Sequence, residues 1–176
     1  DSLFSAFDAG CLGISAPTGL AASDGGYTDR VALSWAAVAG ATIYEVWRNT
    51  QLDTATASQI GTSAANSYND TTAVPELMYY YWVKAKNAYT TSGFSAYNAG
   101  WRHLATPTNL QASDGAYSDK VRVTWDIVAY AMTYEVRRNT ANDFSTAVTV
   151  APTVSGTTFD DLAAVDDRLR VGVAAD

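Results

Sequence analysis

Acidic side chains at turns are the first residues in this chain that could do chemistry. Asp24 and Asp29 flank a Gly-rich turn, and the same pair returns 90 residues later as Asp114 and Asp119. Hard cations such as Ca²⁺ prefer several oxygen ligands, which carboxylates near turns can supply. The spacing matches no complete calcium loop, however, and an Asp-Gly pair is also what an ordinary turn requires. The pattern therefore favours turn formation, with calcium as the alternative.

Groups for acid–base or nucleophilic catalysis are sparse. The chain has one histidine, His103, and one cysteine, Cys11, and neither recurs in the repeat described below. Asp160 and Asp161 are adjacent carboxylates expected in a loop, whereas general acid–base catalysis needs carboxylates held in a cleft. The sequence shows no Gly-rich phosphate loop, Cys/His metal cluster or nucleophile elbow. We predict no catalytic residue, no cofactor and no enzyme activity.

Aromatic side chains form a second candidate site. If alternate residues of segments 44–48 and 79–85 face a core, then Trp47, Tyr80 and Trp82 point to the opposite side. Exposed aromatic patches usually mark contacts, and flat rings can also stack on sugars. We expect these three residues to contact another module or subunit, to lie along their own sheet without a partner, or to bind carbohydrate. The residues aligned with Trp47 and Trp82 in the second half are Arg137 and Gly172, so this face is special to the first half.

The composition favours strands and argues against two classes of partner. Hydrophobic residues make up 48% of the chain and charged residues 16%, with 11 Tyr and 5 Trp, a balance typical of strands. The net charge of −7 argues against nucleic acid or an anionic membrane as partner. No run of about 18 apolar residues is present, so we expect no membrane insertion.

The elements that must position these residues repeat along the chain. Residues 17–50 and 107–140 are identical at 20 of 34 positions, an offset of 90 residues, which is typical of a modular array. The segment from Phe4 to Gly10 aligns at the same offset with the segment from Phe94 to Gly100. We therefore expect an isolated strand in residues 1–16, one whole module in residues 17–104, and a second module in residues 105–176 that stops before its last strand.

Each module is predicted to be a β-sandwich. Short alternating or aromatic-rich segments are separated by turn signals at Asp24-Gly25-Gly26, Ala39-Gly40-Ala41 and Asn69-Asp70. The expected strands of the first module are residues 20–23, 31–35, 44–48, one or two strands within 60–68, 79–85 and 94–101. In the second module, alternation places a strand at 169–175. Such a series of short strands without an amphipathic helix indicates a sandwich of two sheets.

The same positions resemble a fibronectin type III domain. The matching residues are Pro17, Leu20, Val31-x-Leu33-x-Trp35, Tyr44-x-Val46, Tyr68, Pro75 and Tyr79-x-Tyr81-x-Val83-x-Ala85. The resemblance covers nearly the whole chain and implies that Trp35 is the core tryptophan of strand B and Tyr79 the corner tyrosine of strand F. The second module departs from this pattern, because Pro75 has no proline counterpart and Leu169 aligns with Tyr79. We expect the second module to be the less stable one when isolated.

The resemblance implies an all-β fold of two tandem immunoglobulin-like (fibronectin type III) sandwiches, the second lacking its own last strand. The Ser-Asp-Gly-x-Tyr-x-Asp-[Arg/Lys]-Val element is similar to a variant found in bacterial surface and secreted proteins, which implies an extracellular or cell-surface location.

The phase of the repeat suggests how modules associate. A sheet edge without its last strand is normally covered, and adding an extended segment to such an edge is a known mode of association. We therefore expect residues 1–11 of one chain to complete the second module of the next, with Leu3, Phe4, Ala6 and Phe7 at the subunit interface. Under this hypothesis Phe4 and Ala6 enter the second module. The alternative is a longer tandem array in which flanking modules supply the same strand within one chain.

The predicted function is therefore a noncatalytic structural protein of an extracellular filament, stalk or surface array, whose partner is another copy of itself or flanking modules of the same chain. A carbohydrate-binding or adhesive accessory module of a secreted enzyme or adhesin is the alternative.

Overall fold

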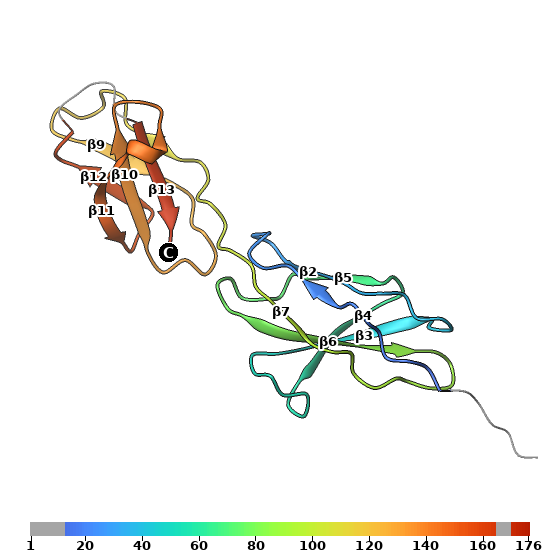
Figure 1. Cartoon of the computed structure of the whole chain (residues 1–176). Helices are drawn as coiled ribbons and strands as arrows, with labels where there is room; N and C mark the ends of the chain where they lie inside the picture. Colours follow the sequence, from blue (N-terminus) through green and yellow to red (C-terminus); the bar gives the residue numbers. More distant parts are fainter. Residues whose placement is uncertain (1–12, 165–169) are drawn as a thin grey trace, which may run out of the picture. The chain divides into compact units, whose positions relative to one another are not determined.

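The computed structural model describes residues 13–164 and 170–176, which fold as two units, Asp1–His103 and Leu104–Asp176 (Figure 1). We call their described parts module 1 and module 2 and treat each by itself. Both are built from strands, and one 3-10 turn is the only helical element among the described residues. None of the described segments forms a helix with the length and apolar character needed to cross a membrane.

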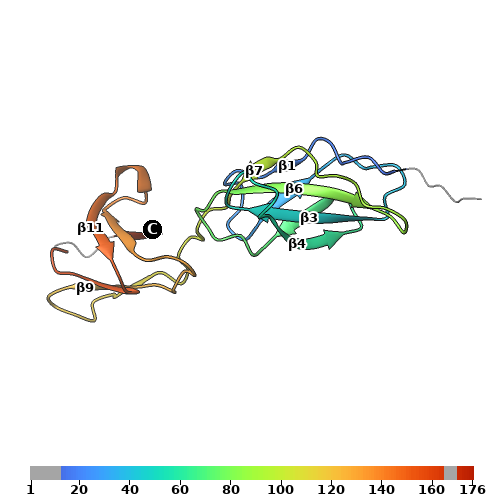
Figure 2. The same ribbon diagram turned by 90° about the horizontal axis from the view of Figure 1, so that it is seen from below.

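Module 1 is a sandwich of two antiparallel sheets. One sheet has the order β1-β2-β5 and the other β4-β3-β6-β7. Figure 2 shows β7 lying beside β6, with β1 close to it. The strands are β1 (Ala21–Ala22), β2 (Val31–Ser34), β3 (Ile43–Asn49), β4 (Ser58–Ser63), β5 (Ser67–Asp70), β6 (Tyr79–Lys86) and β7 (Asn98–Gly100).

Module 2 repeats this architecture with six strands in its described part. Its sheets have the orders β12-β9-β8 and β11-β10-β13. The elements are β8 (Gln111–Ala112), β9 (Val121–Thr124), β10 (Tyr134–Asn139), the 3-10 turn η1 (Phe144–Thr146), β11 (Val148–Val154), β12 (Thr158–Asp161) and β13 (Arg170–Ala175). β13 is the last strand described, so the absence of a further strand in this module stays a prediction.

The predicted alternation explains how each strand meets its core. Val31 and Leu33 of β2 are buried, as are Tyr79, Tyr81, Val83 and Ala85 of β6, because residues two apart in a strand face the same side. Each core is centred on the same pair of rings in an edge-on arrangement. In module 1 the pair is Trp35 and Tyr44, with centroids 5.3 Å apart, and in module 2 it is Trp125 and Tyr134, at 5.4 Å.

The strand pairing confirms that the two modules align residue by residue. Val46 of β3 faces Val83 of β6, and in the same register Val136 of β10 faces Val173 of β13. Gly172 is therefore the counterpart of Trp82, as the sequence predicted. The pairing of β2 with β5 and of β9 with β12 likewise makes Tyr68 the counterpart of Phe159.

One expectation about strands is confirmed and another needs adjustment. The segment between residues 60 and 68, expected to hold one or two strands, contains parts of two, β4 and β5. The last strand of module 1 is shorter than predicted, since only Asn98–Gly100 forms a regular ladder with β6. Residues 92–95 still run along β6, but there the backbone ladder is replaced partly by serine side chains, as described below. The predicted N-terminal strand, with Leu3, Phe4, Ala6, Phe7 and Cys11, lies outside the described residues.

A glycine in β4 makes room for the ring of Tyr68. The register between β3 and β4 shifts between Val46 and Trp47, and Tyr68 crosses this point to donate a hydrogen bond from its hydroxyl to the carbonyl of Ile60 at 3.0 Å. A Cβ atom at Gly61 would lie 2.8 Å from two ring carbons of Tyr68. In module 2 the equivalent pair is Ala151 and Phe159, which lacks the hydroxyl.

We predict that Gly61→Ala lowers the free energy of unfolding of module 1 by about 1–3 kcal/mol, because a methyl group is forced against the ring of Tyr68. Tyr68→Phe alone should cost about 1 kcal/mol for the lost hydrogen bond. The double variant should cost less than the sum, because the untethered ring can shift away from the new methyl group. Urea unfolding followed by tryptophan fluorescence tests this, since four of the five tryptophans lie in module 1. Strictly additive losses would contradict the proposed contact.

Candidate functional site

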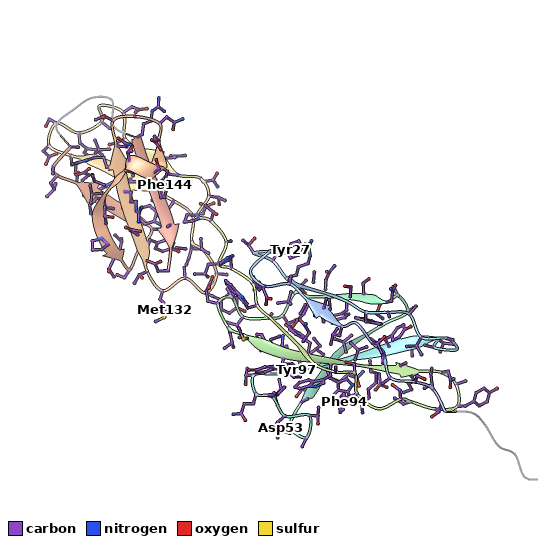
Figure 3. All side chains as sticks on the ribbon, viewed as in Figure 1. Tyr27, Asp53, Phe94, Tyr97, Met132 and Phe144 are labelled. Atoms are coloured by element: carbon purple, nitrogen blue, oxygen red, sulfur yellow. The ribbon has the colours of Figure 1, made fainter. Side chains whose placement is uncertain are left out.

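The predicted aromatic face exists, but its rings pack on one another. Trp47 of β3 and Trp82 of β6 lie directly opposite each other on neighbouring strands. Phe94 meets both edge-on, with centroids 5.5 Å from that of Trp47 and 6.4 Å from that of Trp82. The ammonium group of Lys84 covers the ring of Phe94 at 4.0 Å and that of Trp47 at 5.0 Å. We call these four residues the aromatic cluster; Figure 3 labels Phe94 within module 1.

The expectation that Trp82 is exposed is wrong. Its side chain points to the outer side of the sheet, but it is only 4% exposed, because Phe94 arrives from the neighbouring strand and covers it. Trp47 and Tyr80 are half-buried, and Tyr80 contacts the exposed ring of Tyr97 edge-on at 5.8 Å. Among the interpretations left open by the sequence, this geometry favours tryptophans lying along their own sheet over a flat carbohydrate platform.

Module 2 covers the same face by other means. Arg137 and Gly172 replace the two tryptophans, and Phe144 of η1 lies beside them. The guanidinium group of Arg137 is 5.3 Å from the Phe144 ring centroid, and a Cβ at Gly172 would lie 2.9 Å from that ring. Phe144 was not predicted from the sequence. The repeat gave no signal for it, since the aligned residue of module 1 is Thr54.

The outer edge of β13 is the second candidate site. β10 pairs with one side of β13, and no described strand lies along the other. A groove of about 460 Å³ follows this edge. In module 1 the corresponding edge of β6 is occupied by the segment that ends in β7. We call this the edge groove; its lining residues are Leu104, Ala105, Thr106, Pro107, Leu110, Phe144, Gly172, Val173, Ala174 and Ala175.

A buried polar network stabilises module 1. Asp70 is 1% exposed and accepts hydrogen bonds from Arg48 at 2.6 Å, from Tyr81 at 3.0 Å and from the hydroxyl of Thr72 at 2.7 Å. Burial alone would raise the pKa of Asp70, but the bonds from Thr72 and Arg48 outweigh it and hold the pKa below its usual value. Burial and the neighbouring Asp70 raise the pKa of Tyr81, so its hydroxyl stays a donor. The corner tyrosine, Tyr79, accepts a long hydrogen bond of 3.4 Å from the amide of Val74.

Module 2 keeps only part of this network. Arg138 pairs with Asp161 at 2.7 Å, but the counterparts of Tyr81 and Thr72 are Val171 and Ala163. The expectation that Asp160 and Asp161 lie in a loop is wrong, since both belong to β12. Asp160 accepts hydrogen bonds from Arg122 at 2.7 Å and from Lys120 at 2.8 Å, and these bonds lower its pKa.

The calcium candidates are spread over surface turns. Asp29 pairs with the adjacent Arg30 at 2.9 Å, and Asp24, Asp114 and Asp119 are exposed. Within residues 13–164 and 170–176, no group of three or more His, Cys, Asp or Glu side chains is placed to hold a metal ion. His103 contacts the carboxylate of Glu76 at 3.1 Å and the Trp101 ring, a pairing that brings no nucleophile to the imidazole.

Solved structures with similar folds are known. A Fn3-like protein from Clostridium thermocellum is 28% identical, with a TM-score of 0.48 over 52% of this chain and 95% of that chain. A two-domain fibronectin type III segment of chicken tenascin is 16% identical, with a TM-score of 0.64 over 92% of this chain and 91% of that chain. The chain carries the fibronectin type III fold twice. No family model matches this sequence, and no curated protein does either. In fibronectin type III terms, β6 and β13 are the F strands and β7 is strand G of the first module.

We predict that Trp82→Ala costs module 1 about 3–5 kcal/mol, the usual range for removing a buried tryptophan. The reason is that Trp82 is the covered centre of the aromatic cluster. Tyr89→Ala, at a side chain that is 83% exposed, is the control and should stay within about 0.5 kcal/mol of the parent. Urea unfolding measures both, and an unchanged midpoint for Trp82→Ala would show that the cluster contributes nothing to folding.

We also predict that Asp70 makes module 1 sensitive to acid. A carboxylate whose folded-state pKa is depressed stabilises the fold fully above its unfolded-state pKa, which is about 3.9, and this stabilisation is lost as the pH falls toward the lower folded-state value. Urea midpoints of the parent should therefore drop between about pH 5 and pH 2. Asp70→Asn should be less stable at pH 7 and show a shallower drop over that window. Equal slopes for the two proteins would contradict this assignment.

Proposed function

We propose that this chain is a noncatalytic structural component of an extracellular filament, stalk or surface array. In this proposal residues 1–11 of one copy complete the sheet of module 2 in the next copy by running along the edge groove. The observation that carries the proposal is the outer edge of β13, where a groove occupies the place that strand G occupies in module 1.

The identity of the donated strand is supported by the repeat. Residues 1–11 and residues 91–101 are identical at six of 11 positions, namely 2, 4, 5, 6, 9 and 10. The second of these segments contains β7, which pairs with β6 through Asn98, Ala99 and Gly100. Strand edges carry unpaired amide and carbonyl groups, and a segment with the sequence of strand G is the natural partner for the edge of an F strand.

A head-to-tail contact of this kind favours growth of a filament. The donor segment and the edge groove are different surfaces of the same chain, so each copy has one of each to offer. A contact between unlike surfaces repeats from copy to copy and gives an open filament unless the rotation between copies closes a ring. In a longer array, a flanking module would supply the same strand within one chain, and the role as a structural spacer would be unchanged.

The carbohydrate-binding alternative receives less support. Ring stacking on a sugar needs an open aromatic face, and the aromatic cluster presents Trp82 only 4% exposed, beneath Phe94. No exposed pair of tryptophans is found among the described residues that would replace it. These observations support a structural role better than carbohydrate binding.

The test is the assembly state of chain 1–176. Sedimentation velocity at several concentrations, together with negative-stain electron microscopy, should show oligomers that lengthen with concentration. A variant in which residues 1–11 are replaced by an equal length of Gly and Ser should be monomeric and keep its tryptophan spectrum. Identical monomers from both proteins would contradict donation between copies and favour a strand supplied by flanking modules. Identical oligomers from both would show that another surface assembles the chain.

A further inference from the structure

Strand G of module 1 is held by side chains as well as by its backbone. The amide of Val83 donates to the hydroxyl of Ser95 at 3.0 Å, and the amide of Ala85 donates to the hydroxyl of Ser92 at 2.9 Å. The backbone amides of the same serines donate to the carbonyls of Val83 and Ala85 at 2.9 and 2.8 Å. Both serines are buried, so two hydroxyl groups serve as acceptors for the edge of β6.

Two further positions fix the strand against the opposite sheet. The side-chain oxygen of Asn98 accepts a hydrogen bond from the amide of Ala22 at 3.0 Å. Gly100 passes so close to β1 that a Cβ there would lie 2.7 Å from the Cβ of Ala22 and 2.8 Å from the carbonyl oxygen of Ser23. The strand therefore needs an acceptor at position 98 and no side chain at position 100.

The N-terminal segment carries all four of these features at the 90-residue offset. Ser2 and Ser5 align with Ser92 and Ser95, and Gly10 aligns with Gly100. Asp8 replaces Asn98 and keeps an oxygen acceptor. Leu3, by contrast, aligns with Gly93, where the first module has no side chain. The N-terminal segment therefore keeps the acceptor positions and the glycine that hold strand G in module 1.

Module 2 presents the matching groups. Because β13 pairs with β10 in the register that β6 uses with β3, Val173 and Ala175 are the counterparts of Val83 and Ala85. Both line the edge groove. On the opposite sheet, Ser113 accepts a hydrogen bond from the amide of Arg122 at 2.9 Å, as Ser23 does from Ala32 at 3.0 Å in module 1. The backbone around Ala112 therefore follows that around Ala22.

One position of the groove differs in a way that selects a side chain. In module 1, Phe94 rests on Trp82. In module 2 the counterpart of Trp82 is Gly172, and the ring of Phe144 lies over it, 2.9 Å from where a Cβ would stand. Phe144 lines the edge groove and is 56% exposed. Figure 3 shows Phe144 at the η1 turn of module 2. A phenylalanine at the position of Phe94 would meet the exposed side of the Phe144 ring.

We infer that the donated strand docks on module 2 in a single register, with Phe4 packed against the exposed side of the Phe144 ring. In this register the Ser5 and Ser2 hydroxyls accept from the amides of Val173 and Ala175. This inference rests on the proposed function and specifies which residues fix the register of the donated strand on module 2. It also revises the expectation that Phe4 and Ala6 both enter module 2, because Phe94 packs on the outer side of the sheet and Ala96 is exposed.

Thiol crosslinking tests the register directly. In a Cys11→Ser background, Phe4→Cys is combined with Phe144→Cys and treated with a short bismaleimide, which spans more than a disulfide. A ladder of covalent multimers on a reducing gel is expected. The matched control pairs Phe4→Cys with Leu52→Cys, an equally exposed apolar residue of module 1 at 54%, and should give only monomers. A ladder of similar yield from both pairs, or an internal crosslink without multimers, would overturn the inference.

Two point variants separate the register from assembly itself. Ser5→Val removes a buried acceptor and should weaken association about tenfold or more, as expected when a buried amide is left unpaired. Tyr89→Ala, at a side chain of module 1 that is 83% exposed and is not among the residues lining the edge groove, should leave association unchanged. Oligomers that ignore Ser5→Val and give no 4–144 crosslink would overturn the register while leaving the proposed function standing. Monomers from the parent chain would overturn both.

Discussion

The structure depends on pairing the outer edge of the F strand. In module 1 the backbone groups along this edge meet β7, the backbone of residues 92–95 and the hydroxyls of Ser92 and Ser95. Where the last strand leaves the regular ladder, serine hydroxyls replace carbonyl oxygens as hydrogen-bond acceptors. The amides at this edge of β6 are therefore paired although β7 itself is short. The same edge in module 2 borders a groove. Unpaired edges invite other strands, and under the proposed function the pairing of this edge determines whether one chain joins another.

The two modules share a core and differ on the outer side of the F strand. Several core positions are kept in kind, among them the Trp35–Tyr44 and Trp125–Tyr134 pairs. The outer side has exchanged a tryptophan pair for Arg137, Gly172 and a ring from η1. The buried network around Asp70 has likewise lost its tyrosine and threonine in module 2. The modules therefore differ both in this buried network and on the outer side of the F strand, and the second of these regions borders the surface that we assign to assembly.

Sequence reasoning recovered the strands because alternation reports directly which residues share a face. It placed Trp82 on the correct side of the sheet but not its burial, because Phe94, which covers it, is brought there by the order of strands. Phe144 had no periodic signal, since it sits in a turn and acts on Gly172 through space. The serine acceptors were also missed, although the repetition of Ser92 and Ser95 as Ser2 and Ser5 was visible in the sequence. Periodicity therefore predicts which face of a strand a residue lies on, whereas contacts between elements can be predicted only once the order of the strands is known.

The contact between Gly61 and Tyr68 has a consequence for how such repeats evolve. Gly61 goes with Tyr68 in module 1, and Ala151 goes with Phe159 in module 2. Tandem repeats in a gene exchange segments by unequal crossing-over, and a breakpoint between these two positions would join halves from different modules. One product would bring a methyl group against a tethered tyrosine ring, and the other would leave a glycine opposite a phenylalanine without either contact. Both hybrid modules should therefore be less stable than their parents, whereas exchange of whole modules keeps each pair together.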